Sequence, residues 1–262
     1  MLPRIAALIE NKSSPRRFAA PTRAIRWTDG PRGAIARAMT NSRAKAPAPA
    51  PKSADESGGR IMLATPPRMD PEALAPMLRA ALATGVVGCV RMDMPGAGEA
   101  DIRRAADILR PICHEADVAL ILAEHFRMAK PLGLDGVEVE SRHARLRDVR
   151  AEIGPDAIMG VACGASRHDG MTAAEAGADY VLFRPHHAQG ALGDGAVADL
   201  ELFQWWAEMI ETPVVAEGGV GAAEIAALAP FADFAIPDAD VWEGDVAAKT
   251  KALNAILEAD EG

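Results

Sequence analysis

The sequence has few of the features that mark secreted, membrane or nucleic-acid-binding proteins. Only 4% of its 262 residues are aromatic, with a single tyrosine, and its three cysteines form no C-x-x-C pair. No stretch of 18 apolar residues occurs, so no membrane span is expected. The odd number of cysteines argues against a disulfide-bonded scaffold and favours reduced thiols in a cytoplasmic protein. Hydrophobic residues make up 49% of the chain, which is enough for a large core.

Charge is divided unevenly along the chain. Residues 1–60 contain 12 Lys or Arg and 4 Asp or Glu, a net charge of +8, so the whole-chain charge of −9 leaves −17 for residues 61–262. A body this acidic repels the phosphates of nucleic acids over its whole surface. No nucleic-acid partner is therefore expected.

The first 58 residues differ in composition from the rest. They show no sustained apolar period, and they end in the tract APAPAP at 46–51 followed by KSADESGG at 52–59. Such a tract cannot bury enough apolar surface to offset its ordering entropy. We predict a disordered basic arm with a Pro/Ala linker over residues 1–58 and one folded domain over residues 59–262. The arginine-rich composition also fits a targeting segment, and this alternative stays open.

A strand-and-helix pattern repeats eight times after residue 59. Short apolar runs typical of strands lie at 61–65, 88–92, 119–123, 136–139, 157–162, 180–183, 213–216 and 234–236. Helical periodicity fills the intervals at 71–84, 99–116, 126–132, 145–153, 167–176, 200–210, 222–229 and 246–259. This alternation predicts a single (β/α)₈ TIM barrel, since eight units in about 200 residues match the lower size range of that fold. An open doubly wound sheet is less favoured because no G-x-G-x-x-G follows the first strand.

Polar residues gather where the predicted strands end. Ligands of (β/α)₈ barrels lie at these carboxyl ends, so the gathering predicts a charged site at one end of the barrel. The residues are Thr65, Arg68, Arg91, Asp93, Glu124, His125, Glu138, Glu140, Cys163, Arg184, His186, His187, Glu217, Asp238 and Asp240.

Three motifs carry a resemblance to a known family. They are GPDAIMGV at 154–161, AAEAGADYV at 173–181 and TPVVAEGGV at 212–220. Over about residues 60–262 the chain resembles the thiamine phosphate synthase and TenI family. The resemblance implies a (β/α)₈ barrel that joins hydroxymethylpyrimidine diphosphate to thiazole phosphate with Mg²⁺ and releases pyrophosphate. TenI members of the family can instead aromatise the thiazole ring.

Most catalytic motifs that the resemblance implies are changed in this chain. The family's Gln-x-Arg-x-Lys falls on residues 89–93, where Arg91 remains and Asp93 replaces the lysine. The family's Asn-Asp pair falls on residues 123–124, where Glu124 offers Mg²⁺ a hard oxygen donor. The His-x-Gly-Gln-x-Asp motif falls on residues 138–143, beginning with Glu138. Arg91, Glu124 and Glu138 are therefore the candidate catalytic residues of an enzyme with reduced or altered catalysis.

The candidate phosphate site has features for and against an anion. Gly218 and Gly219 precede a predicted helix, where free amides favour phosphate, and Arg91 and Arg184 are further candidate phosphate-binding residues. After the eighth strand the family implies a Val-Ser turn of free amides, but this chain has PDAD at 237–240. The proline removes a donor, and each carboxylate opposes a phosphate by about 1–4 kcal/mol. A small phosphorylated or anionic ligand is still the expected partner.

Other interpretations stay open. Arg91 and Glu138 both point into the barrel by strand alternation, so they can pair as a structural ion bridge. The barrel can also be non-catalytic and bind an anionic ligand or a protein partner, and a homodimer is left open. His186 and His187 fit a solvated loop pair. A weaker alternative is a metal-dependent enzyme with a new site for Zn²⁺, Mn²⁺ or Fe²⁺ built from Glu124, His125, His186, His187 and Glu217.

Overall fold

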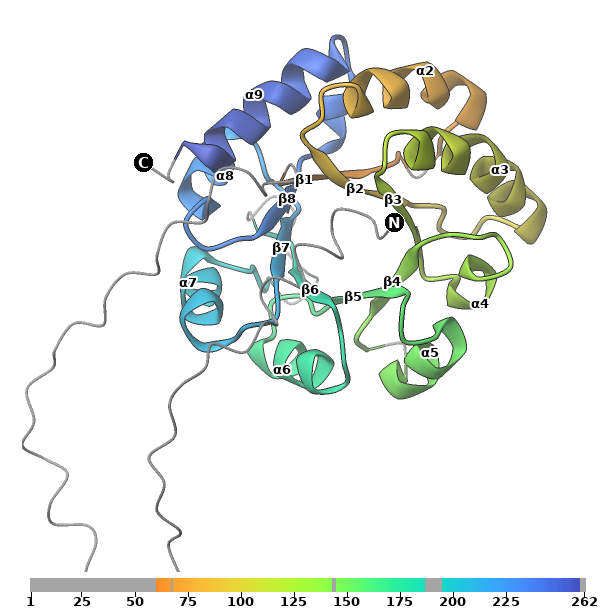
Figure 1. Cartoon of the computed structure of the whole chain (residues 1–262). Coiled ribbons are helices and arrows are strands. Elements are labelled where there is room, and N and C mark those ends of the chain that lie inside the picture. The colour runs from red at the N-terminus through yellow and green to blue at the C-terminus, as the bar shows by residue number, and fades with distance from the viewer. Residues whose placement is uncertain (1–59, 67, 143–144, 187–194, 260–262) are drawn as a thin grey trace, which may run out of the picture.

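Eight parallel strands close into a barrel in the order of the sequence. The computed structural model describes residues 60–66, 68–142, 145–186 and 195–259. Neighbouring strands pair consecutively from β1 to β8, β8 pairs with β1, and helices surround the strands (Figure 1). The predicted (β/α)₈ barrel is therefore confirmed. The arm at residues 1–58 lies outside the described residues, and its disorder stays a prediction.

The elements follow the expected alternation. The strands are β1 (Ile61–Ala64), β2 (Val87–Met92), β3 (Ala119–Ala123), β4 (Gly136–Glu140), β5 (Ile158–Ala162), β6 (Tyr180–Phe183), β7 (Val214–Glu217) and β8 (Phe234–Ile236). The helices are α2 (Pro71–Leu82), α3 (Glu99–Glu115), α4 (Phe126–Ala129), α5 (Leu146–Ile153), α6 (Arg167–Glu175), α7 (Leu200–Met209), α8 (Ala222–Leu228), the 3₁₀ helix η2 (Ala239–Trp242) and α9 (Val246–Glu258). In the described part of the chain, no helix has both the length and the apolar composition needed to cross a bilayer.

Two elements differ from the expectation. The helix predicted over 126–132 ends at Ala129, because Pro131 has no amide hydrogen to donate to the carbonyl of Arg127. The chain continues as a turn to Gly133, whose φ of 64° favours glycine. The 3₁₀ helix η2 after β8 was not predicted, because four residues are too few to show a hydrophobic period.

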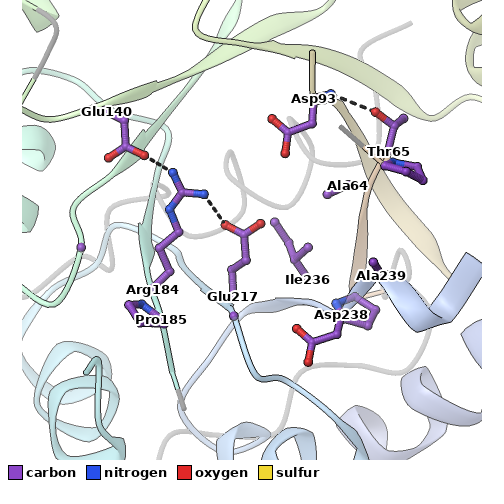
Figure 2. Close-up of a pocket in the computed structure, with 14 residues that line it drawn as sticks. Ala64, Thr65, Asp93, Glu140, Arg184, Pro185, Glu217, Ile236, Asp238 and Ala239 are labelled. Atoms are coloured by element: carbon purple, nitrogen blue, oxygen red, sulfur yellow. Dashed lines mark hydrogen bonds and ion pairs between the residues drawn. The ribbon is translucent and has the colours of Figure 1, made fainter. Parts of the chain in front are cut away.

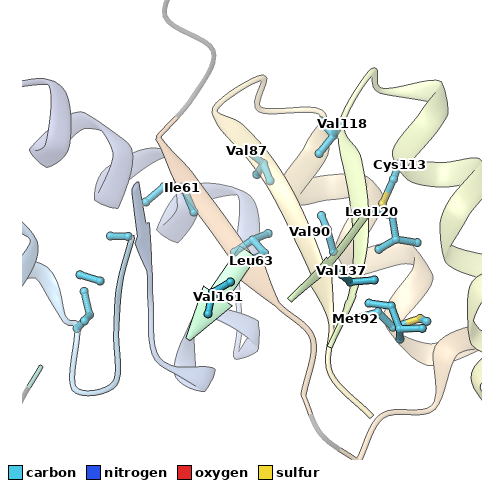
Figure 3. Close-up of a cluster of buried hydrophobic side chains, with 14 of the residues drawn as sticks. Ile61, Leu63, Val87, Val90, Met92, Cys113, Val118, Leu120, Val137 and Val161 are labelled. Carbon is cyan, nitrogen blue, oxygen red and sulfur yellow. The ribbon is translucent and has the colours of Figure 1, made fainter. Parts of the chain in front are cut away.

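Each strand is buried on both faces. In β3, Ala119 and Ile121 face the interior of the barrel, while Leu120 and Leu122 pack into the larger cluster between strands and helices. Figure 3 shows this outer cluster around Val90 and Leu120. Because both faces are covered, the strands appear in the sequence as continuous apolar runs.

Three aspartates repeat one contact at the amino-terminal ends of the strands. Asp135 precedes β4 and accepts the amide of Leu120 in β3 at 2.8 Å. Asp179, before β6, accepts a hydrogen bond from the amide of Met159 in β5 at 2.7 Å. Asp233, before β8, accepts one from the amide of Val214 in β7 at 2.9 Å. These bonds link neighbouring strands at the end of the barrel opposite the strand carboxyl ends.

Arg60 ties the start of β1 to the last two helices. Its guanidinium donates to the carbonyls of Ala229 at 2.8 Å, Ala232 at 2.5 Å and Leu257 at 2.5 Å. Its backbone amide donates to the side chain of Asn254 at 2.9 Å. The folded domain therefore includes Arg60.

We expect limited proteolysis to remove the predicted arm and to leave a stable fragment that begins close to Arg60. The predicted disorder of the Pro/Ala linker would expose it to proteases, whereas Arg60 is held by α8 and α9. Intact-mass spectrometry locates the cut, and the fragment should melt at the temperature of the full chain. A resistant fragment that still contains Trp27 would contradict the predicted boundary.

Candidate functional site

A pocket of about 520 Å³ opens at the carboxyl ends of the strands, where the sequence predicted a site (Figure 2). This volume lies within the range of about 300–1,000 Å³ that is usual for small-molecule sites. Backbone and apolar groups of β1, β8 and the turns beside them form part of the wall. The charged lining residues come from the ends of different strands and are Asp93, Glu140, Arg184, Glu217 and Asp238.

Arg91 is the centre of an ion-pair network inside the barrel. Its side chain, on β2, is 1% exposed and contacts Glu138 at 2.7 Å, Asp93 at 3.0 Å and Glu217. Its Nε is the one buried side-chain nitrogen or oxygen without a hydrogen bond among the described residues. The predicted ion bridge between Arg91 and Glu138 is therefore present. Neither residue is part of the pocket lining.

Arg184 extends the network into the wall of the pocket. Its guanidinium contacts Glu217 at 3.0 Å and also contacts Glu140 (Figure 2). Glu217 is thus shared by both arginines. The complete network sets two guanidinium groups against four carboxylates, those of Asp93, Glu138, Glu140 and Glu217.

Burial and pairing shift the pKa values of these groups in opposite directions. Burial raises the pKa of the Glu138 carboxyl group, although Arg91 and the hydroxyl group of Tyr180 oppose the shift. Burial also acts to raise the pKa of Glu217, but the two neighbouring arginines outweigh it and lower that pKa. For Arg91, burial acts to lower the pKa, while Glu138 and Glu217 raise it well above the usual value. Arg91 and Glu217 are therefore charged at neutral pH.

Tyr180 is a site residue that the sequence analysis missed. Its hydroxyl group donates to Glu138 at 2.8 Å, from a ring that crosses the barrel interior and is 2% exposed. Gly160 on the neighbouring strand makes room for the ring, since a Cβ atom there would lie 2.1 Å from it. The sequence signal was a lone tyrosine on a strand beside a strand with glycine in its middle.

The predicted phosphate turn lies at the edge of the pocket. Gly218 and Gly219 have φ values of 83° and 74°, which favour glycine. The amide of Gly219 donates to Oδ1 of Asp238 at 3.0 Å, and the amide of Gly221 donates to Glu224 at 3.1 Å. Two amides of this turn are therefore already paired with carboxylates of the protein itself.

Glu124, the predicted Mg²⁺ ligand, lies just beyond β3 and is exposed. Its φ of 64° is unusual for a residue with a side chain, and its carboxylate accepts the amide of Glu140 at 3.1 Å. Mg²⁺ is usually held by one or two carboxylates together with phosphates of a substrate. Asp93, Glu140 and Glu217 are already paired with arginines, so these residues do not fit a metal site built by the protein alone.

The predicted histidine site has no support in the described part of the chain. His186 uses its Nδ1 for the carbonyl group of Ala198, at 2.8 Å, and His125 lies at the start of α4. No three His, Cys, Asp or Glu side chains in the described ranges are placed to hold a metal ion. His187 lies outside those ranges, so its role stays a prediction.

The fold and the pocket define a (β/α)₈-barrel protein with a pocket at the carboxyl ends of its strands, where ligands of this fold bind. A model of the family described as thiamine monophosphate synthase, TMP-TENI, matches residues 61–233. The chain belongs to this family, which confirms the resemblance inferred from its motifs.

Individual relatives agree with the family. The thiamine-phosphate synthase of Rhodospirillum centenum is 44% identical over 161 residues, which cover 62% of this chain and 78% of that protein. The thiamine-phosphate synthase of Erythrobacter litoralis is 36% identical over 178 residues, covering 64% and 81%. The solved thiamine phosphate pyrophosphorylase from Pyrococcus furiosus has a TM-score of 0.68 at 24% identity and covers 78% of this chain and 97% of that one. This last similarity supports the fold.

We expect Arg91→Met to lower the free energy of unfolding by about 3–5 kcal/mol, because it leaves the Glu138 carboxyl group buried without its cation. Adding Glu138→Gln should recover part of this loss, since the amide carries no charge. Urea unfolding of the two single variants and the double variant measures the coupling. As a control, Arg79→Met breaks an exposed pair with Glu115 and should cost at most about 1 kcal/mol. A double variant no more stable than Arg91→Met would contradict a stabilising buried pair.

Proposed function

We propose that this protein binds a small phosphorylated ligand of thiamine metabolism, such as thiazole phosphate, and that its catalysis of the family reaction is reduced or altered. The observation that supports the proposal is the pairing of both arginines of the site with carboxylates of the protein. Arg91 is enclosed by three carboxylates, and Arg184 contacts Glu140 and Glu217.

The family reaction joins two phosphorylated molecules and releases pyrophosphate. Negative charge grows on the departing pyrophosphate, so the transition state needs hydrogen-bond donors and cations that are free to face it. In this chain Asp93 takes the place of the lysine that the family resemblance implies, and it contacts Arg91 at 3.0 Å. We propose that this exchange of a cation for an anion slows the departure of pyrophosphate.

We propose distinct roles for the residues around the pocket. Arg184 is 35% exposed and lines the pocket, so it is the cation that can turn toward a phosphate. The Gly218–Gly219 turn would offer backbone amides to the same group. Arg91 and Glu138 are positioning residues in this proposal, because both are buried and they hold Glu217 and Tyr180.

A second candidate function is ligand binding without catalysis. It is favoured by the same paired arginines, because a barrel whose Arg91 and Arg184 both contact carboxylates can still enclose a small anion. Turnover and binding measured on one preparation separate the two candidates. All three cysteines are free and buried, which supports the proposal of a cytoplasmic protein with reduced thiols.

We expect the wild-type chain to form thiamine phosphate from the two family substrates at well under about 1 per second, the lower end of ordinary enzyme rates. Asp93→Lys should raise the rate at least about tenfold, since one missing donor in such a site commonly costs about 10²–10³ in rate. Asp240→Lys is the matched control, because it changes the charge equally at an exposed residue that contacts Lys249 and not the network. Pyrophosphate release is measured. Wild-type turnover at an ordinary rate would reject reduced catalysis.

We expect Mg²⁺ alone to leave the melting temperature unchanged, because the carboxylates of the pocket are already paired. Glu124→Ala should behave as wild type in this measurement. A rise in melting temperature that appears in wild type and is lost in Glu124→Ala would show instead that Glu124 is a metal ligand.

A further inference from the structure

We propose that Asp238 competes with the ligand's phosphate for the backbone amide of Gly219 and so weakens phosphate binding. The carboxylate of Asp238 accepts that amide at 3.0 Å and lies in the lining of the pocket. An anionic ligand must then displace this carboxylate before it can use the amide. The inference rests on the proposed phosphate site at the Gly218–Gly219 turn.

The barrel order brings the two groups together. β7 and β8 are neighbours, and Glu217 at the end of β7 pairs with Ile236 at the end of β8. The turn after β7 and the segment after β8 therefore leave the barrel side by side, which brings Gly219 and Asp238 within hydrogen-bonding distance. The contact is formed by the fold, although the two residues are 19 positions apart in the sequence.

The Asp238 side chain is directed away from its own helix. Asp238 is the N-cap residue of η2, where an aspartate usually accepts an amide of the helix that it precedes, but it makes no such bond. Its Oδ1 accepts the amide of Gly219 instead. The helical amides thus do not hold this carboxylate in place, and the amide of Gly219 does.

The backbone around Asp238 is anchored. The carbonyl group of Asp238 accepts the amide of Val241 at 3.0 Å, and the indole of Trp242 donates to the carbonyl of Ala64 at 2.8 Å. Pro237 is buried. A ligand therefore has to turn the Asp238 side chain, because the segment that carries it is fixed.

A carboxylate is a close chemical substitute for a phosphate oxygen at a backbone amide, since both are anionic acceptors. The exchange of one for the other gains little in hydrogen bonding, and the displaced carboxylate still repels the incoming anion. Asp238 therefore lowers the affinity for every phosphate. A phosphorylated ligand then depends more on its remaining groups, such as a heterocyclic ring, for its binding energy.

Asp240 provides a matched comparison within the same helix. It is exposed, lies two residues beyond Asp238, and is 3.7 Å from the ammonium group of Lys249. Neutralising Asp240 removes the same charge from the same segment without freeing the amide of Gly219. Comparing substitutions at Asp238 and Asp240 therefore distinguishes competition for the amide of Gly219 from a general effect of the lost negative charge.

The test is isothermal titration calorimetry with inorganic phosphate on the full chain and on Asp238→Ala, Asp238→Asn and Asp240→Asn. Asp238→Ala should lower the Kd for phosphate about tenfold or more, because it removes both the competing acceptor and its charge. Asp238→Asn keeps an uncharged acceptor and should give a smaller gain. Asp240→Asn should change the Kd less than about twofold, since an exposed charge outside the contact is screened.

Equal gains in Asp240→Asn and Asp238→Ala would overturn the proposal, because the effect would then come from net charge alone. An unchanged Kd in Asp238→Ala, with the melting temperature of wild type, would also overturn it. Gly219→Val in the Asp238→Ala background separates a failure of the proposed competition from a failure of the proposed phosphate site. If Gly219→Val abolishes phosphate binding while Asp238 has no influence, the turn is the phosphate site and the competition fails. If Gly219→Val has no effect, the proposed site itself fails.

Discussion

A guanidinium group enclosed in a barrel is the constraint on which the rest of the site depends. Arg91 is almost fully buried, and a buried cation is tolerated only when nearby carboxylates replace its hydration. β4 supplies Glu138 and β7 supplies Glu217, so the charge of one strand is balanced by side chains of two others. Glu217 also pairs with Arg184, and Glu138 also accepts a hydrogen bond from the hydroxyl group of Tyr180. Four of the five charged residues that line the pocket, Asp93, Glu140, Arg184 and Glu217, belong to this network.

Such a network changes what an incoming anion encounters. In a site preorganised for phosphate, the arginine side chains and backbone amides have no protein partners. Here Arg91 and Arg184 contact carboxylates, and the amide of Gly219 contacts Asp238. Under the proposed function, binding a phosphate would therefore exchange one set of ionic contacts for another. The net gain is the difference between two similar energies, which is small compared with that of a preorganised site. Affinity then depends on the part of the ligand that carries no charge.

The fold could be predicted from the sequence because periodicity is a local property. Each strand is buried on both faces and each helix has one apolar face, so all eight units were visible without knowledge of their neighbours. The contacts of the site are not local. The bonds from Tyr180 to Glu138 and from Gly219 to Asp238 join residues 42 and 19 positions apart, and they depend on register and rotamers across the barrel. The pairing of Arg91 with Glu138 was foreseeable, because strand alternation alone points both side chains inward.

Two of the three motifs that carry the family resemblance form turns at the strand-entry end of the barrel, whereas the third, TPVVAEGGV, ends in the pocket with Glu217 and Gly218. In the motif AAEAGADYV, Asp179 accepts the amide of Met159 and contacts Arg150 at 2.6 Å. In GPDAIMGV, Gly154 ends α5 with a φ of 92°. These contacts shape the turns that lead into the strands, the end of a (β/α)₈ barrel that serves stability, whereas ligands meet the opposite end. Among the described residues, none of those in the strand-entry turns lines the pocket, so the two ends of the barrel are physically separate. A barrel can therefore keep the motifs of its strand-entry end while a charge that lines its pocket changes sign, as Asp93 illustrates where the family resemblance implies a lysine.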